Sequence, residues 1–291
     1  MRVLVTGSRG FIGRHVMTAL DNAGIESVQF DKVDGDDVLQ NSKINRKAQG
    51  CTHVIHLAGI LGTSELFSRA HDAIDVNVHG TLNVLTACER NGLGYVGCTT
   101  PEVWDNVYQA TKHCARSLAS AWHRYKGVPV CNVRAFNAYG EGQKLRPVQK
   151  IIPTFAWRGW RGEPLPVWGD GTQQVDLVWV GDVAEMLVRA LHFGADEVFD
   201  AGTGVGRSVI DIAHDVINMT GGRARIKHLP MRAGEHEANG VAGGQGWDLI
   251  SFRPIVRSDQ LRRTVRSYAS GSLATTNISA GEDDLFRMSK Q

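Results

Sequence analysis

A tyrosine and a lysine stand one helical turn apart in the stretch VYQATKH, at Tyr108 and Lys112. Side chains at positions i and i+4 of a helix project from the same face, so both groups can act on one bound molecule. A free phenol has a pKa of about 10 and is a poor base at neutral pH. A neighbouring ammonium favours the phenolate. The pair therefore predicts a general acid/base at Tyr108, with Lys112 as its electrostatic partner.

Two threonines end a strand-like run just upstream of this helix, at Thr99 and Thr100 in LGYVGCTT. A hydroxyl at that place can hydrogen-bond the substrate oxygen that gains or loses the proton. A Y-x-x-x-K spacing is common by chance. Its meaning therefore depends on whether the rest of the chain provides a cofactor site.

Three glycines in VTGSRGFIG, Gly7, Gly10 and Gly13, lie between a predicted strand and a predicted helix. Gly7 permits the tight turn, Gly10 lets backbone N–H groups approach a pyrophosphate, and Gly13 lets the helix and strand pack closely. The helix N-terminus adds partial positive charge. The spacing is G-x-x-G-x-x-G, and its position between strand and helix predicts a dinucleotide site.

An aspartate ends the second predicted strand, at Asp31 in SVQFDK. A carboxylate there can accept hydrogen bonds from a ribose diol and repels a 2′-phosphate, which favours NAD. Arg9 and Lys32 favour the alternative, because either cation could neutralise the 2′-phosphate of NADP. We expect NAD as the cofactor, and NADP stays open as the alternative.

The elements that must position these residues alternate between strand-like and helix-like segments over the first half of the chain. Strands that are apolar on both faces, alternating with helices, predict a parallel sheet covered on both sides. We therefore expect an α/β protein with a Rossmann-type, doubly wound domain over residues 1–141. A smaller α/β substrate lobe is expected over 142–270, with segments that can interleave with the first domain, and a flexible tail over 271–291.

Composition excludes several other classes of protein. The chain has 291 residues, of which 42% are apolar and 21% charged, and its net charge is +2, so we expect neither a nucleic-acid nor a membrane partner. The basic runs RPVQK and LRRTVR are interpreted as solvated surface. The five cysteines form no C-x-x-C pair, the histidines are scattered, and no secretory signal is recognised. These features favour a reduced cytoplasmic protein without a metal site.

Together these residues resemble the extended short-chain dehydrogenase/reductase family, in its NAD-dependent epimerase/dehydratase branch that acts on nucleotide sugars. The resemblance runs from Met1 to about Glu235. It is carried by TGSRGFIG, HLAG, NVHGTLNVLTAC, YQATK, RAFNAYGEG, GDGTQQVDLVWVGDV and MRAGE. Each stretch alone is weak evidence, but the set is specific.

The resemblance implies a role for each matching residue. Thr100, Tyr108 and Lys112 would be catalytic, with Thr100 rather than Thr99 as the family hydroxyl. The cofactor would contact Tyr108 and Lys112 together with Gly7, Arg9, Gly10, Phe11, Ile12, Gly13, Asp31, Lys32, Asp36, Leu57, Ala58, Gly59, Asn77 and Phe136. The substrate would contact Thr100, Glu102, Asn137 and Arg232. Simpler interpretations remain for some of them: core packing for Leu57, Ala58 and Phe136, and a helix cap for Asn77.

Three departures from the family pattern affect the expected reaction. Val175 stands in TQQVD where an arginine usually binds the nucleotide phosphates. Pro101 replaces one member of the acid pair that dehydratases carry after the catalytic threonine, and only Glu102 remains. Tyr108 follows Thr100 by a shorter loop than the family usually has, which predicts a more open pocket or an unusual substrate.

The sequence therefore predicts an NAD-dependent nucleotide-sugar epimerase that acts through a transient 4-keto sugar. One alternative is an NADP-dependent keto-sugar reductase or a dehydratase of the same family, and another is a non-catalytic dinucleotide-binding module. The resemblance also implies a homodimer, formed through the two long helices that begin near Ala70 and Val107.

Overall fold

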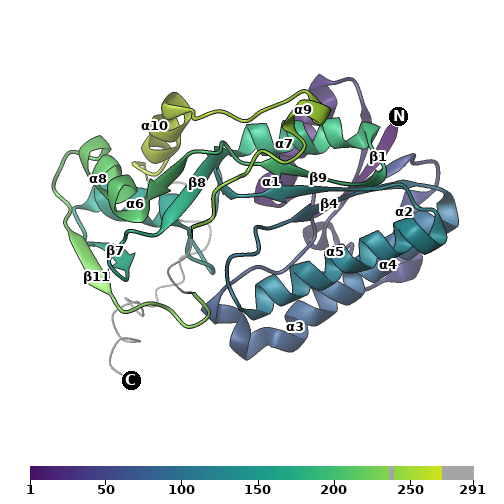
Figure 1. Ribbon diagram of the computed structural model, residues 1–291, viewed down its shortest axis with the longest axis horizontal. Coiled ribbons are helices and arrows are strands. Elements are labelled where there is room, and N and C mark those ends of the chain that lie inside the picture. The colour runs from purple at the N-terminus through teal and green to yellow at the C-terminus, as the bar shows by residue number, and fades with distance from the viewer. Residues whose placement is uncertain (236–238, 271–291) are drawn as a thin grey trace.

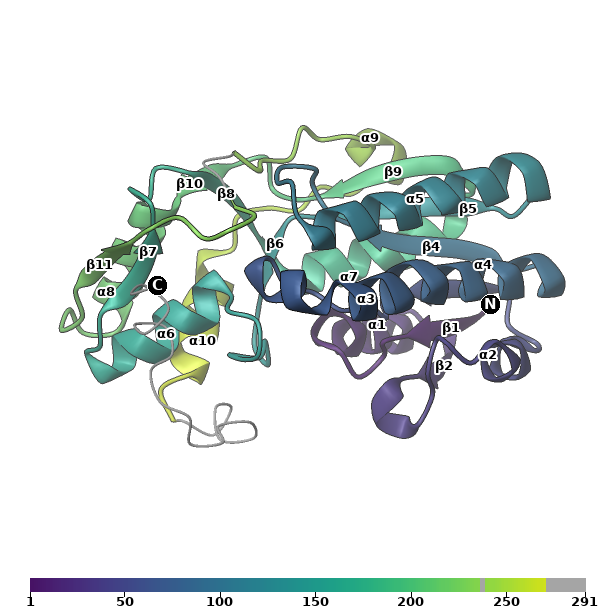
Figure 2. The ribbon, with the colours of Figure 1, turned by 90° about the horizontal axis from the view of Figure 1, so that it is seen from below.

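A six-stranded parallel sheet forms the centre of the larger lobe in the computed structural model, which describes residues 1–235 and 239–270. Figures 1 and 2 show this lobe beside a smaller one. The strands of the sheet lie in the order β2 (Glu26–Phe30), β1 (Arg2–Thr6), β3 (His53–His56), β4 (Gly94–Thr99), β5 (Val130–Ala135) and β9 (Ala195–Ala201).

Helices cover both faces of this sheet because its strands are apolar on both faces. Val3 and Val5 pack with α1 (Phe11–Asn22) and α7 (Val180–Arg189), whereas Leu4, between them, packs on the opposite side. The helices of that opposite side are α2 (Asn41–Ala48), α4 (Gly80–Asn91) and α5 (Val107–Lys126). A short helix, α3 (Ala70–Ile74), and a π-helical turn (Asp75–His79) lead into α4. The expected Rossmann-type architecture is confirmed.

The strand order places the switch point of the sheet between β1 and β3. The connection after β1 runs to one edge, and the connection after β3 runs toward the other, so a crevice opens beyond the carboxyl ends of these two strands. Gly7 follows β1 and Leu57 follows β3. The topology thus brings the glycine turn and the HLAG stretch to the place where such sheets bind ligands.

The smaller lobe packs around its own core, which includes Phe155, Leu177 and Ile212. It contains a three-stranded sheet in the order β10–β8–β6 and a two-stranded sheet of β11 and β7. Its elements are β6 (Asn137–Tyr139), α6 (Ile151–Arg161), β7 (Leu165–Trp168), β8 (Gln174–Trp179), β10 (Gly206–Ser208), α8 (Val209–Met219), β11 (Ile226–Leu229) and α10 (Ser258–Ser267).

The chain returns to the larger lobe within the segment expected to form the smaller one. Helix α7 packs beside α1, and β9 pairs with β5 as the sixth strand of the main sheet. A short helix, α9 (Trp247–Ile250), also lies against β9. The expected tail at 271–291 lies outside the described residues.

Candidate active site

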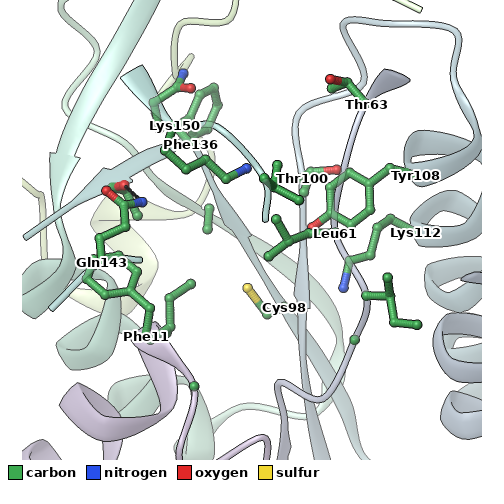
Figure 3. Close-up of a pocket in the computed structure, with 18 of the residues that line it drawn as sticks. Phe11, Leu61, Thr63, Cys98, Thr100, Tyr108, Lys112, Phe136, Gln143 and Lys150 are labelled. Carbon is green, nitrogen blue, oxygen red and sulfur yellow. Dashed lines mark hydrogen bonds between the residues drawn. The ribbon is translucent and has the colours of Figure 1, made fainter. Parts of the chain in front are cut away.

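A cavity of about 780 Å³ lies between the two lobes, and residues from both line it. Figure 3 shows Tyr108 and Lys112 projecting into it from α5, with Thr100 and Cys98 contributed by β4 and its end. Of the residues assigned above to catalysis, cofactor or substrate, Arg9, Asn77 and Glu102 do not line the cavity. The others do: Gly7, Gly10, Phe11, Ile12, Gly13, Asp31, Lys32, Asp36, Leu57, Ala58, Gly59, Thr100, Tyr108, Lys112, Phe136, Asn137 and Arg232.

The glycine turn has room for a ligand only because its residues lack side chains. Gly7 adopts φ +70°, and a Cβ there would lie 2.8 Å from the backbone nitrogen of Ala58. A Cβ on Gly13 would lie 2.1 Å from the carbonyl oxygen of Gly7, so α1 could not pack this close to β1. Gly10 precedes α1 and offers no side-chain cap, which leaves the first N–H groups of the helix open to an anion. This arrangement fits the pyrophosphate of a dinucleotide.

Asp31 is held in place by two backbone groups at the end of β2. Its carboxylate accepts hydrogen bonds from the N–H groups of Arg9 (2.8 Å) and Val33 (3.0 Å). The Arg9 guanidinium donates to both carboxylate oxygens of Asp34 at 2.9 Å, and this pairing raises the pKa of Arg9. Both cations that favoured NADP are thus paired with carboxylates, since the Lys32 ammonium lies 3.3 Å from an oxygen of Asp37.

Asp36 fixes the segment that follows β2. Its carboxylate is buried and pairs with the ammonium groups of Lys43 and Lys47, both on α2. The pairs hold α2 against the end of the sheet. Asp36 is therefore a cavity-lining residue whose charge is already neutralised.

Burial shifts the pKa values of both Tyr108 and Lys112. It raises the pKa of the Tyr108 phenol above its usual value and lowers the pKa of the Lys112 ammonium. The thiol of Cys98 lies close enough to both groups to interact with them electrostatically, and burial raises its pKa also. The protein alone thus favours the phenol at Tyr108, and the positive charge of an oxidised nicotinamide would oppose that effect.

The short connection between β4 and α5 is closed by a glutamine side chain. Asn106 caps α5 by accepting a hydrogen bond from the N–H of Gln109 at 3.0 Å. The Gln109 side chain folds back over the connection, accepting a hydrogen bond from the Thr100 hydroxyl at 3.0 Å and donating one to the carbonyl of Pro101. Thr100 is thereby held at the edge of the cavity.

Glu102, expected to contact the substrate, points out of the cavity. Its carboxylate accepts from Nδ1 of His113 at 3.1 Å and lies 3.5 Å from a guanidinium nitrogen of Arg116, on the exposed side of α5. Pro101 and Val103 line the cavity on either side of it. The chain bends at Glu102, and its contacts with His113 and Arg116 place the carboxylate on the outer side of the connection.

Asn77 lies behind the cofactor wall rather than in it. Its amide accepts a hydrogen bond from the N–H of Ile60 (2.8 Å) and donates to the Ile60 carbonyl (2.9 Å) and to the Thr111 hydroxyl (3.0 Å). It thus ties the loop after β3 to α5, the helix that carries Tyr108. The simpler interpretation as a helix cap does not describe these contacts, because Asn77 lies within the π-helical turn.

A buried histidine, absent from the sequence predictions, continues this network toward the glycine turn. Nδ1 of His56 lies 2.7 Å from the Thr6 hydroxyl, and Nε2 lies 3.1 Å from the Thr81 hydroxyl. The Thr81 hydroxyl donates to the carbonyl of Asn77 at 2.7 Å. Burial lowers the pKa of His56 to about 3, with a smaller effect from Lys112, so the imidazole is neutral.

The part of the cavity lined by Thr63, Lys150, Thr154 and Gln173 is called the substrate half below. Its polar groups include several that form no hydrogen bond with other described residues. Lys150 immediately precedes α6, and Figure 3 shows its side chain pointing into the cavity. The hydroxyl of Thr154, one turn further along α6, is buried without a hydrogen-bond partner, as are the hydroxyl of Thr63 and the side-chain oxygen of Gln173. All four residues line the cavity.

The RPVQK run thus differs from its interpretation as solvated surface. Its lysine, Lys150, is enclosed by the cavity, and this burial lowers its pKa, with opposing effects from Glu65 and Arg232. Arg232, predicted to contact a nucleotide diphosphate, is paired with Glu235 at 3.0 Å and lies over the ring of Trp168. The sequence signal for Lys150 is its position just before a helix whose apolar face carries Ile152 and Phe155.

The described residues contain neither a membrane-spanning helix nor a metal-binding cluster. No helix within residues 1–235 and 239–270 is both long and apolar enough to cross a bilayer. Over the same residues, no cluster of three or more histidine, cysteine, aspartate or glutamate side chains is arranged to hold a metal ion.

Comparison with known proteins matches residues 3–202 to the model of the NAD dependent epimerase/dehydratase family. A similar curated protein is the UDP-N-acetyl-alpha-D-glucosaminuronate decarboxylase of Bacillus cytotoxicus, 27% identical over 267 residues, with 79% of this chain and 83% of that protein covered. The dTDP-glucose 4,6-dehydratase of Streptomyces niveus is 26% identical, with 92% and 93% covered.

A solved structure with the same fold is the Thermus thermophilus UDP-glucose 4-epimerase in complex with NAD. Its TM-score is 0.84 at 26% sequence identity, and the match covers 94% of this chain and 100% of that one. Because the family model spans more than half of the chain, and because its glycine turn, Asp31, Tyr108 and Lys112 line one cavity, this protein is an enzyme of the NAD-dependent epimerase/dehydratase family.

Proposed function

We propose that this enzyme is an NAD-dependent nucleotide-sugar epimerase that works through a transient 4-keto sugar. The observation that carries the proposal is that, among residues 1–235 and 239–270, no free carboxylate lines the cavity beside Thr100, Tyr108 and Lys112. The acidic residues among those lining the cavity are Asp31, Asp36, Asp37 and Glu235. The first three follow β2 at the cofactor end, and Glu235 is paired with Arg232.

Elimination of water from a sugar needs a general acid and a general base besides the groups that oxidise the alcohol. Pro101 has no ionisable side chain, and Glu102 faces away from the cavity with His113 and Arg116. Oxidation followed by reduction on the other face needs neither group. This favours epimerisation over the dehydratase alternative.

Tyr108, Lys112 and Thr100 each have a separate role in the oxidation of the sugar. Tyr108 takes the proton of the sugar hydroxyl, and the Lys112 ammonium stabilises the phenolate that must accept it. Thr100 orients the reacting oxygen. Bound NAD supplies the acceptor, and later the donor, of the hydride. Return of the proton from Tyr108 to the keto oxygen completes the cycle with the opposite configuration.

NAD rather than NADP is supported by the pairing of Arg9 with Asp34 and of Lys32 with Asp37. A 2′-phosphate would have to compete with these carboxylates and would lie near Asp31. The same pairing weighs against the NADP-dependent reductase alternative. Full activity on nucleotide sugars would in turn remove the non-catalytic alternative.

The diphosphate of the substrate is assigned to Lys150, Arg232 and Asn137. Val175 lines the cavity where the family usually has an arginine, so a cation must come from elsewhere. Lys150 is a half-buried ammonium that points into the cavity, with Glu65, Arg232 and Glu235 within electrostatic reach. Burial disfavours its charged form, and a phosphate ligand would favour it and so stabilise this part of the protein.

Decarboxylation of a nucleotide-linked uronic acid is a second candidate, favoured by the similarity to the Bacillus cytotoxicus decarboxylase. It requires the same oxidation at C4. Loss of carbon dioxide from the resulting keto acid needs no additional carboxylate. The two candidates therefore share every residue role up to the keto sugar and differ only in the product.

We also propose a homodimer formed through α4 and α5. Both helices carry exposed residues on their outer side, and Tyr125 of α5 is 76% exposed. Sedimentation velocity tests this proposal, and a monomer at micromolar concentration would contradict it.

Incubation of the NAD-loaded enzyme with a panel of UDP- and dTDP-linked sugars and uronic acids tests the function. A C4 epimer is the expected product, whereas carbon dioxide would indicate the decarboxylase and a 4-keto-6-deoxy sugar the dehydratase. Replacing Tyr108 with Phe is expected to lower kcat by about 10²- to 10⁴-fold, the usual contribution of a general acid/base. Full turnover by Y108F would contradict the mechanism.

A further inference from the structure

Gln109, which follows Tyr108, forms a hydrogen bond with the Thr100 hydroxyl, the group expected to orient the reacting oxygen of the sugar. Gln109 is on the same helical turn as Tyr108, but its side chain turns back toward the end of β4. There it makes two hydrogen bonds, one with Thr100 and one with Pro101. The short connection between Thr100 and α5 brings the amide within reach of both.

Chemistry fixes the direction of each of these bonds. The Pro101 carbonyl can only accept, so the NH₂ end of the Gln109 amide must face it. The amide oxygen then faces Thr100, and because that oxygen can only accept, the Thr100 hydroxyl must donate. The single hydroxyl hydrogen of Thr100 is thus directed at Gln109, and only the lone pairs of its oxygen are left for a substrate.

We propose that Gln109 is a positioning residue that makes Thr100 a hydrogen-bond acceptor and removes it from the donors available to a ketone. The proposal rests on the proposed function, since it concerns the sugar alcohol and the 4-keto sugar. Thr100 would accept from a hydroxyl of the bound sugar. During oxidation the hydroxyl proton would pass directly to the Tyr108 phenolate, and the C4 hydrogen would leave with the electron pair of its bond as a hydride, for which bound NAD would be the acceptor.

The keto sugar is then held by fewer donors than it would have without Gln109. With Thr100 committed to Gln109, the keto oxygen can receive a hydrogen bond from the Tyr108 phenol but not from the Thr100 hydroxyl. A site of this kind holds the alcohol better than the ketone, so the equilibrium on the enzyme lies toward NAD and sugar. Such a bias keeps the oxidised sugar short-lived and favours return of the hydride.

The absorbance of NADH at 340 nm, measured at equilibrium with saturating nucleotide sugar, reports this balance. Gln109→Met keeps the side-chain size but removes both polar ends, so Thr100 becomes free to donate to the ketone. We expect the NADH fraction of Q109M to rise by about 2- to 10-fold, the ratio that one ordinary hydrogen bond corresponds to.

His113→Gln is the matched control, because it changes α5 one turn further on and breaks only the contact with Glu102 on the exposed side. Its NADH fraction should equal that of wild type. An NADH fraction in Q109M equal to that of wild type, with Q109M folded and NAD bound, would overturn the proposal.

Neutron diffraction of the deuterium-exchanged enzyme tests the same inference without any sugar. A deuterium on the Thr100 oxygen, directed at the Gln109 side-chain oxygen, is expected. A deuterium directed into the cavity would overturn the proposal, whatever the substrate proves to be. If no nucleotide sugar reduces NAD but the deuterium is found at Gln109, the proposed function fails and the positioning role of Gln109 stands.

Discussion

The two halves of the cavity differ in how far their polar groups are satisfied. In the cofactor half, Arg9 and Lys32 are paired with carboxylates, and Asp31 accepts two backbone hydrogen bonds. In the substrate half, the hydroxyl of Thr154 and the side-chain oxygen of Gln173 are buried without partners among the described residues, and the Lys150 ammonium points into the cavity.

This difference indicates how each half meets its ligand. Buried polar groups without partners cost free energy, and a ligand that satisfies them regains it. The charged side chains of the cofactor half are therefore already paired, and the open groups there are the first N–H groups of α1 and the Ser8 hydroxyl, whereas the substrate half has unpartnered side chains that the bound molecule would complete. We therefore expect a nucleoside diphosphate to raise the unfolding free energy of the smaller lobe more, for each contact that it makes, than a dinucleotide raises that of the larger lobe.

The largest effect is expected where the cofactor half has no room to adjust. Gly13→Ala places a Cβ 2.1 Å from the carbonyl oxygen of Gly7, which is backbone and cannot rotate away. We expect unfolding free energy to fall by up to about 3 kcal/mol, the upper range for overpacking, with at least tenfold weaker NAD binding. Gly243→Ala is the control, because a Cβ there meets nothing within 4 Å.

Denaturant titration and calorimetric NAD binding measure these two effects. UDP binding to folded G13A should be much less affected than NAD binding. Equal losses for NAD and UDP would break the distinction between the two halves.

Removing the Lys150 ammonium should have the opposite effect, weakening the binding of UDP or dTDP more than that of NAD. Lys150→Met is expected to weaken binding of UDP or dTDP by roughly ten- to a hundredfold, the range for a hydrogen bond to a charged group. NAD affinity should not change. Lys144→Met provides the control, since Lys144 lies in the same connection but is exposed. Unchanged diphosphate binding in K150M would show that Lys150 serves only the fold.

A pH dependence should follow from the closed network behind the cofactor half. His56 has a folded-state pKa of about 3 against an ordinary value of 6.5, so the unfolded chain binds the extra proton first as pH falls. The stability contributed by neutral His56 is complete above pH 6.5 and is lost as pH falls toward 3. At pH 5 the loss is about 2 kcal/mol.

The comparison of wild type with His56→Gln isolates this effect, because burial also lowers the pKa values of His15 and His53 and they remain in both proteins. Between pH 7 and pH 5, the unfolding free energy of H56Q should fall by about 2 kcal/mol less than that of wild type. Parallel curves for the two proteins would contradict a neutral His56.

The two halves also differ in how well the sequence predicts them. Gly7, Gly13 and Asp31 were predictable because each answers a local requirement: a positive φ, a close helix–strand contact, or an acid at a strand end. The parallel sheet was predictable because its strands are apolar on both faces. These signals lie within short stretches of the chain.

The substrate half depends on contacts between distant segments, which spacing does not reveal. Lys150 looked like part of a basic surface run, and only the fold brings it near Glu65 and Arg232. Glu102 matched the family pattern, but its contacts with His113 and Arg116 hold its carboxylate outside the cavity. Gln109 carried no signal at all, because its role depends on how the side chain folds back onto Thr100.

The smallest effect concerns the paired charges that set the cofactor preference. Asp34→Asn removes the carboxylate that holds the Arg9 guanidinium, so Arg9 becomes free to meet a 2′-phosphate. NADP binding should tighten by about two- to fivefold, the scale of one exposed charge pair, while NAD binding stays the same because Asp31 keeps both backbone contacts. Calorimetric titration with both dinucleotides measures the ratio of their dissociation constants, and the gain in NADP binding should shrink at high salt.

Asp215→Asn, which frees Arg207 of the smaller lobe from a similar exposed pair, is the matched control and should leave this ratio unchanged. If D34N left NADP binding at the wild-type level, the discrimination would belong to Asp31 alone, and the pairing of Arg9 would be a consequence of the turn rather than part of its selectivity.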